Sequence, residues 1–76
     1  MTKRGSNNIN PKKLMLSKWT AVAPNNKEKH FLVTRVIKDE QETITHCVLE
    51  AVINHREIKL DWRLLKDPAS WLLGWN

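Results

Sequence analysis

The sequence predicts a mainly β protein, a small five-stranded SH3-like antiparallel barrel with one short helical turn before the last strand. Three observations predict this class. A chain of 76 residues has room for one hydrophobic core. Apolar and polar residues alternate over several short stretches, which is the period of a strand. Proline and asparagine separate these stretches, and closing the sheet into a barrel would remove its exposed edges.

The first strand is expected to begin at Trp19. Trp19, Ala21 and Ala23 would share one face, while Lys18 and Thr20 would point to the other. Because proline and asparagine favour turns, residues 24–26 are expected to end this strand.

Two further strands are predicted at residues 30–38 and 44–53, with an acidic loop at 39–43 between them. The first is rich in β-branched and aromatic residues, and both of its faces carry apolar side chains. A tight turn is expected at Asn54 and His55, because asparagine tolerates a positive φ. The residues expected on the buried faces are Phe31, Val33, Ile37, Cys47, Leu49, Ala51 and Ile53.

Residues 56–62 show the cleanest alternation in the chain. Ile58, Leu60 and Trp62 would face the core, and the intervening charged residues would face solvent. After Trp62 the period changes, and a short helical turn is expected near residues 63–70. Asp67-Pro68 suits a turn or a helix start there.

The final segment, residues 70–75, allows two structures. As a strand it would place Trp71, Leu73 and Trp75 on one face, and as a helix it would bring Trp71 and Trp75 together at positions i and i+4. Gly74 disfavours the helix, so a fifth strand is predicted.

Charge is unevenly distributed along the chain. Residues 1–29 carry seven basic and one acidic side chain, a net charge of +6, whereas residues 30–76 carry a net charge of −1. Residues 1–13 contain few apolar side chains and are expected to form a flexible basic tail before a single β domain at 14–76. Such a tail can attract nucleic acid or an anionic surface, or it can simply keep a small protein soluble.

The cellular compartment is expected to be the cytoplasm. Cys47 is the only cysteine, so no internal disulfide is possible, and the N-terminal residues lack the apolar region of a secretory signal. No apolar run is long enough to span a bilayer, so no membrane association is expected.

Neither catalysis nor metal binding is expected, and no cofactor is predicted. Cys47 falls on the apolar face of its strand, and His46 must point to the other face. The three histidines and Cys47 fit no compact zinc motif, and the two glycines form no phosphate-binding loop.

The four tryptophans can serve a small core or a binding surface. Trp62 is expected in the core because it continues the phase of Ile58 and Leu60. Trp19 is expected to be partly buried, and Trp71 and Trp75 are harder to bury so close to the end of the sequence.

The segments NPKKLMLSKWTAVAPNNKEKHFLVTRVI, CVLEAVI, LDWRLLKD and WLLGW together resemble a family of small, conserved, tryptophan-rich hypothetical bacterial proteins, a domain of unknown function. The resemblance covers residues 10–76 and includes the local context of all four tryptophans. It implies no ligand or catalytic role, so the expected function comes from the residues themselves.

The expected function is a non-enzymatic binding module that binds single-stranded RNA or DNA. Aromatic rings stack on unpaired bases while lysines follow the phosphates. The alternative is a protein–protein interaction module whose aromatic surface recognises an extended peptide or a partner subunit. The oligomeric state is left open. The residues expected at the binding surface are Lys12, Lys13, Lys18, Trp71 and Trp75.

Overall fold

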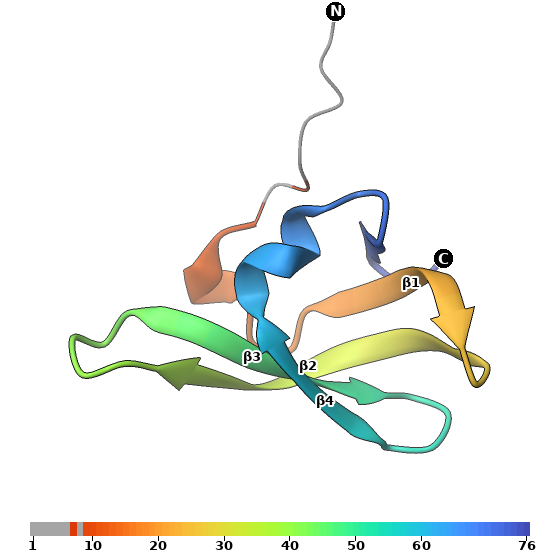
Figure 1. Cartoon of the computed structure of the whole chain (residues 1–76), viewed down its shortest axis with the longest axis horizontal. Helices are drawn as coiled ribbons and strands as arrows, with labels where there is room; N and C mark the ends of the chain where they lie inside the picture. The colour runs from red at the N-terminus through yellow and green to blue at the C-terminus, as the bar shows by residue number, and fades with distance from the viewer. Residues whose placement is uncertain (1–6, 8) are drawn as a thin grey trace, which may run out of the picture.

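The computed structural model describes residues 7 and 9–76 of the chain. Five antiparallel strands form one sheet in the order β4-β3-β2-β1-β5 (Figure 1). The strands are β1 (Lys18–Asn25), β2 (Glu28–Lys38), β3 (Ile44–Ala51), β4 (Glu57–Asp61) and β5 (Trp71–Leu73). The described residues also form two 3₁₀ helices, η1 (Pro11–Lys13) and η2 (Trp62–Lys66). The predicted mainly β fold is confirmed, including the short helical turn before the last strand and the strand at 71–73.

The sheet does not close into the predicted barrel. β4 and β5 are its two edges, and in the described part of the chain no strand pairing joins them. β5 is short, and its three residues pair with Trp19, Thr20 and Ala21 of β1. η2 lies over one face of the bent sheet between these edges (Figure 1) and inserts Leu65 into the core.

The core lies on the face of the sheet that η1 and η2 cover. Its buried members are Leu14, Trp19, Phe31, Val33, Cys47, Leu49, Ala51 and Leu65. Most of the predicted inward-facing residues are therefore confirmed. Two are wrong. A bulge between Val33 and Arg35 brings Val36 to the core in place of Ile37, and Ile53 is 63% exposed because β3 ends at Ala51.

Pro24 lies within β1 instead of ending it. Regular pairing of β1 with β2 stops at Thr20 and resumes only at Asn25, and β5 reaches no further along β1 than Ala21. The missing N–H of proline therefore removes no ladder hydrogen bond at this position.

η2 begins earlier than the sequence predicts. Asp61 caps it by accepting a 2.9 Å hydrogen bond from the backbone N–H of Arg63. Asp67 does not start the helix. It forms the turn that follows, where its carboxylate accepts a 2.9 Å bond from the N–H of Ala69.

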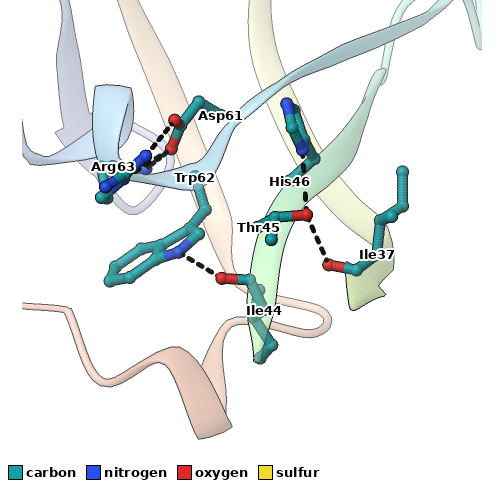
Figure 2. A network of polar contacts seen from close by, with 7 residues as sticks. All are labelled: Ile37, Ile44, Thr45, His46, Asp61, Trp62 and Arg63. Atoms are coloured by element: carbon teal, nitrogen blue, oxygen red, sulfur yellow. Dashed lines mark hydrogen bonds and ion pairs between the residues drawn. The ribbon is translucent and has the colours of Figure 1, made fainter. Parts of the chain in front are cut away.

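Trp62 connects η2 to β3. Its indole N–H donates to the carbonyl of Ile44 at 3.0 Å (Figure 2), and the ring packs half-buried against the core. The fully buried tryptophan is instead Trp19, which is 1% exposed. Trp19 sits in the middle of three strands, opposite Phe31 and Leu73, whereas Trp62 follows the edge strand β4. The predicted partial burial of Trp19 is therefore wrong.

The described residues before Leu14 contact the domain. The backbone N–H of Asn7 donates to the carbonyl of Lys66, and its side-chain amide donates to the carbonyls of Leu65 and Trp71. Ile9 packs against the core. The predicted flexible tail concerns in large part residues 1–6 and 8, which lie outside the described residues. Neither 3₁₀ helix in the described ranges has the length and apolar character needed to cross a membrane.

Replacing Trp19 with alanine is expected to destabilise the fold by about 3–5 kcal/mol, the range for deleting a buried aromatic side chain. Trp62→Ala should cost clearly less, because that ring is only partly buried. Urea unfolding followed by circular dichroism measures both. Equal losses in the two variants would contradict the different burial of the two rings.

Candidate nucleic-acid interface

Trp75 presents a fixed but accessible aromatic ring. The residue is 43% exposed, yet its indole N–H donates to the carbonyl of Phe31 at 2.9 Å. The chain reaches this position through Gly74, whose φ of +90° is a conformation that L side chains rarely adopt. No atom lies within 4 Å of an added Cβ, so the backbone conformation and not the space favours glycine here.

Thr20 holds the segment on both sides of Trp75. Its hydroxyl donates to the carbonyl of Gly74 at 2.6 Å and accepts from the N–H of Asn76 at 3.0 Å. Thr20 is itself buried in β1. Because the Thr20 hydroxyl both donates and accepts a hydrogen bond, it fixes the backbone on both sides of Trp75. The indole therefore loses little rotational freedom when a ligand binds to it.

Two further side chains gather at Trp75. The Lys18 ammonium lies 4.9 Å from the centroid of the indole, within cation–π range. The ring of His30 lies 6.1 Å away at an interplanar angle of 39°, and its Nε2 donates to the carbonyl of Asn76 at 2.8 Å. We call Lys18, His30 and Trp75 the Trp75 platform.

Trp71 lies on the opposite face of the sheet from the platform. Its ring meets that of Phe31 edge-on, with centroids 5.4 Å apart, and is half-buried. Phe31 and His30 are neighbours in β2 and must point to opposite faces. The prediction that Trp71 and Trp75 share one face is therefore wrong, because β5 ends at Leu73 and Gly74 redirects the chain.

Lys12 and Lys13 are exposed residues of η1 and are not part of the platform. Lys13 lines a cavity of about 210 Å³ together with Leu73, the residue before Gly74. Lys12 does not line it. Of the predicted binding residues, the structure thus brings Lys18 and Trp75 together, places Lys13 near Leu73 at the end of β5, and separates Trp71 from Lys18 and Trp75.

The acidic loop lies far from the platform. Asp39, Glu40 and Glu42 occupy the hairpin between β2 and β3, at the left end of the long axis in Figure 1. The C-terminal residues and the hairpin between β1 and β2 lie toward the other end. An anionic ligand on Trp75 therefore does not meet these three carboxylates.

An ion pair between a buried carboxylate and an exposed arginine was not predicted from the sequence. Glu28 is 3% exposed and accepts hydrogen bonds from the Nε of Arg56 at 2.7 Å, from its Nη2, and from the amide of Asn54 at 2.7 Å. Glu28 lies between Lys27 and Lys29, a pattern typical of a solvated face. Its partners lie beyond the β3 strand, so no local signal could have identified them.

The ion pair joins the hairpin between β1 and β2 to the one between β3 and β4. The hydrogen bonds from Arg56 and Asn54 lower the pKa of Glu28 to about 2. Glu28 and Arg56 also line a second cavity, of about 260 Å³, with Phe31, Ile58 and Trp71.

Cys47 is fully buried in β3, and burial raises the pKa of its thiol to about 11. At neutral pH it is a protonated core side chain with little nucleophilicity. Within residues 7 and 9–76, no three His, Cys, Asp or Glu side chains gather as ligands of a metal ion would.

Residues 17–76 match the model of a family described as Tryptophan-rich protein (DUF2389). The chain belongs to this family. The whole Trp75 platform lies within the matched DUF2389 residues, whereas Lys12 and Lys13 precede them. No curated protein and no solved structure matches the chain.

The ion pair of Glu28 with Arg56 predicts a loss of stability in acid. The pKa of Glu28 is lower in the folded protein than its ordinary value of 4.5, so the fold favours the ionised form. This contribution is present above about pH 4.5 and is lost as the pH falls towards about 2. Glu28→Gln should remove this part of the pH dependence of the free energy of unfolding, measured by urea unfolding across that range.

Asp61→Asn is the matched control for this measurement. The hydrogen bonds from Arg63 also lower the pKa of Asp61, so Asp61 adds its own acid dependence. The Asp61→Asn variant should retain the contribution of Glu28. If Glu28→Gln loses stability in acid as steeply as the parent, the ion pair does not stabilise the fold.

Proposed function

We propose that this protein is a non-enzymatic module of the bacterial cytoplasm that binds single-stranded RNA or DNA on the Trp75 platform. The observation that carries the proposal is the combination at one place of an exposed, hydrogen-bonded indole and the ammonium of Lys18, 4.9 Å from its centroid. Stacking on an aromatic face and a cation for phosphate are the two elements of single-strand recognition.

The platform is suited to a base because its ring is held before binding. The indole N–H and the backbone on both sides are already hydrogen-bonded, so the ring loses little conformational entropy when a base stacks on it. In the free protein the Lys18 ammonium lies over the indole of Trp75. The flexible side chain of Lys18 allows the ammonium to move to a phosphate. A base can then take its place on the indole.

Charge supports the same function. Residues 1–29 carry a net charge of +6 and include Lys18. The acidic hairpin between β2 and β3 is at the other end of the molecule (Figure 1). The carboxylates of that hairpin therefore do not repel a negatively charged strand at Trp75.

Two variants should separate the electrostatic and stacking contributions. Lys18→Gln should flatten the dependence of log affinity on log salt by about 0.7, because one phosphate contact is lost on a single strand. Trp75→Leu should weaken binding by roughly 1–3 kcal/mol per stacked base with little change in slope. Fluorescence anisotropy of a labelled oligouridylate, titrated at several salt concentrations, measures both effects.

Lys38→Gln is the matched control for charge, because this exposed lysine lies beside the acidic hairpin, far from the platform. It should change neither the slope nor the affinity. Circular dichroism must show that each variant is folded. No binding of the parent protein to oligouridylate or oligothymidylate at low salt would refute the proposal.

A second candidate function is recognition of an extended peptide at the gap between β4 and β5. This gap contains the cavity of about 260 Å³, lined from both edges of the sheet. Trp71 lines it and is the one tryptophan whose indole N–H makes no hydrogen bond within the described residues. The architecture is then an SH3-like barrel left open at one side, where a peptide strand could pair with a free edge.

Trp71→Phe tests the peptide function, because it keeps an aromatic ring and removes the indole N–H. For a peptide selected from a random library, this change should weaken binding by about 1 kcal/mol, the contribution of one hydrogen bond. Trp75→Leu should leave the affinity for the same peptide unchanged. Isothermal titration calorimetry measures both, and the reverse pattern would place the peptide on the platform instead.

A further inference from the structure

The cavity at the gap between β4 and β5 combines apolar walls with an arginine. Its volume is about 260 Å³, smaller than the roughly 300–1,000 Å³ typical of sites for drug-sized ligands. Phe31, Ile58 and Trp71 provide the large apolar side chains, and Arg56, whose side chain is half exposed, also lines the cavity. Small side chains leave room between these walls, those of Ala21, Ala23 and Ala69. The space suits a single residue of a ligand.

Glu28 binds one side of the Arg56 guanidinium and leaves the other side free. The Nε of Arg56 donates to one oxygen of the Glu28 carboxylate at 2.7 Å, and its Nη2 donates to the other oxygen. Its Nη1 donates to no acceptor within the described residues. A guanidinium has more N–H donors than these two bonds use. The end formed by Nη1 and Nη2 therefore retains a fork that can bind a second carboxylate through parallel hydrogen bonds.

Glu28 holds this fork in place and needs no partner from a ligand. Its carboxylate is 3% exposed and also accepts a 2.7 Å bond from the amide of Asn54. It is the one acidic residue among the described residues that line the cavity, and its charge is compensated by Arg56. The neighbours of Glu28 in the hairpin, Lys27 and Lys29, are exposed cations. The free donors therefore favour an acceptor in the cavity, and the lysines favour an anionic one.

The position of Arg56 in the chain gives the direction of a bound peptide. Arg56 directly precedes β4, and Ile58 of β4 also lines the cavity. β4 is an edge strand, so one row of its backbone N–H and C=O groups pairs with no other strand of the described chain. A peptide that pairs antiparallel with β4 has its C-terminal end beside the start of β4, at Arg56. A parallel peptide would place that end near Asp61 instead.

We propose that this cavity binds the C-terminal residue of a peptide that pairs antiparallel with β4. The α-carboxylate accepts hydrogen bonds from the free fork of Arg56, and the apolar side chain of the same residue fills the space between Phe31, Ile58 and Trp71. This inference rests on the second candidate function, recognition of an extended peptide at this gap, and adds which end of the peptide is recognised.

A C-terminal residue suits the cavity better than an internal residue of a peptide does. An internal aspartate or glutamate would reach Arg56 but would leave the apolar walls uncovered. An internal apolar residue would cover these walls but would offer the guanidinium no carboxylate. A C-terminal apolar residue carries both groups on one Cα, so it uses the walls and the fork together.

Acetyl-tetraalanyl-leucine and its C-terminal amide test the role of the carboxylate. In the isotope-labelled full chain, the indole N–H signal of Trp71 reports on the cavity, because Trp71 lines it. The free acid should shift this signal with a midpoint about tenfold lower than that of the amide, because the amide lacks the charge-assisted contact with Arg56. The indole signal of Trp75, on the opposite face of the sheet, provides the internal reference.

Arg56→Lys tests the fork itself. Lysine keeps a positive charge beside Glu28 but lacks the planar fork, so the acid and the amide should then bind with similar midpoints. Arg63→Lys is the matched control, because Arg63 donates from its Nε and Nη2 to Asp61 in the same way but does not line the cavity. This variant should keep the tenfold preference. Circular dichroism checks that both variants are folded, and the comparison of acid with amide in the parent protein depends on neither.

The outcomes distinguish this inference from the function on which it rests. Equal midpoints for the acid and the amide in the parent protein would overturn the C-terminal site and leave peptide binding at the gap intact. No shift with either form would also overturn it, and the library peptide with Trp71→Phe would then decide the peptide function.

Two further results would reject the inference. If both arginine variants lose the preference for the acid equally, the preference reflects only general charge attraction. If N-acetyl-leucine binds as tightly as the longer acid, the site takes a small carboxylate, and pairing of a peptide with β4 contributes nothing.

Discussion

The burial of Trp19 is the interaction on which the rest of this small fold depends. Its indole lies opposite Phe31 on one side and Leu73 on the other, so one side chain joins β2, β1 and β5. Its N–H reaches Ser17, whose hydroxyl holds the carbonyl of Leu14 after η1. In a chain without a disulfide, a single large buried ring thus joins the N-terminal segment, the centre of the sheet and its last strand.

The same arrangement determines where Trp75 can lie. Because β5 is anchored beside Trp19 for only three residues, the chain is free to turn at Gly74. The Thr20 hydroxyl, on the opposite face of β1 from Trp19, then captures the backbone on either side of Trp75. The exposed ring is therefore a consequence of core packing on one face and a buried hydroxyl on the other. Its accessibility does not require flexibility.

The sequence predicted the features that depend on local periodicity. Alternation identified all five strands and most of the core-facing side chains, because the side-chain period of a strand is visible in a few residues. It could not predict the bulge after Val33, which changes the phase within β2, or the burial of Glu28, whose partners Asn54 and Arg56 are distant in the chain. The sequence also did not show that Trp19 would be more deeply buried than Trp62. The order of the strands in the sheet, and not the alternation within a strand, decides which of the two rings is central.

Both candidate binding surfaces, the Trp75 platform and the gap between β4 and β5, arise because the sheet does not close. At the β5 edge, the side-chain amide of Asn7 donates a hydrogen bond to the carbonyl of Trp71. Part of this edge is therefore already paired with another segment of the same chain. The gap towards β4 remains, with Trp71 and the Glu28–Arg56 pair at its sides. The Trp75 platform lies at the other end of β5, past the turn at Gly74. A strand of nucleic acid crossing that end would leave the gap accessible, so binding at one surface does not exclude binding at the other.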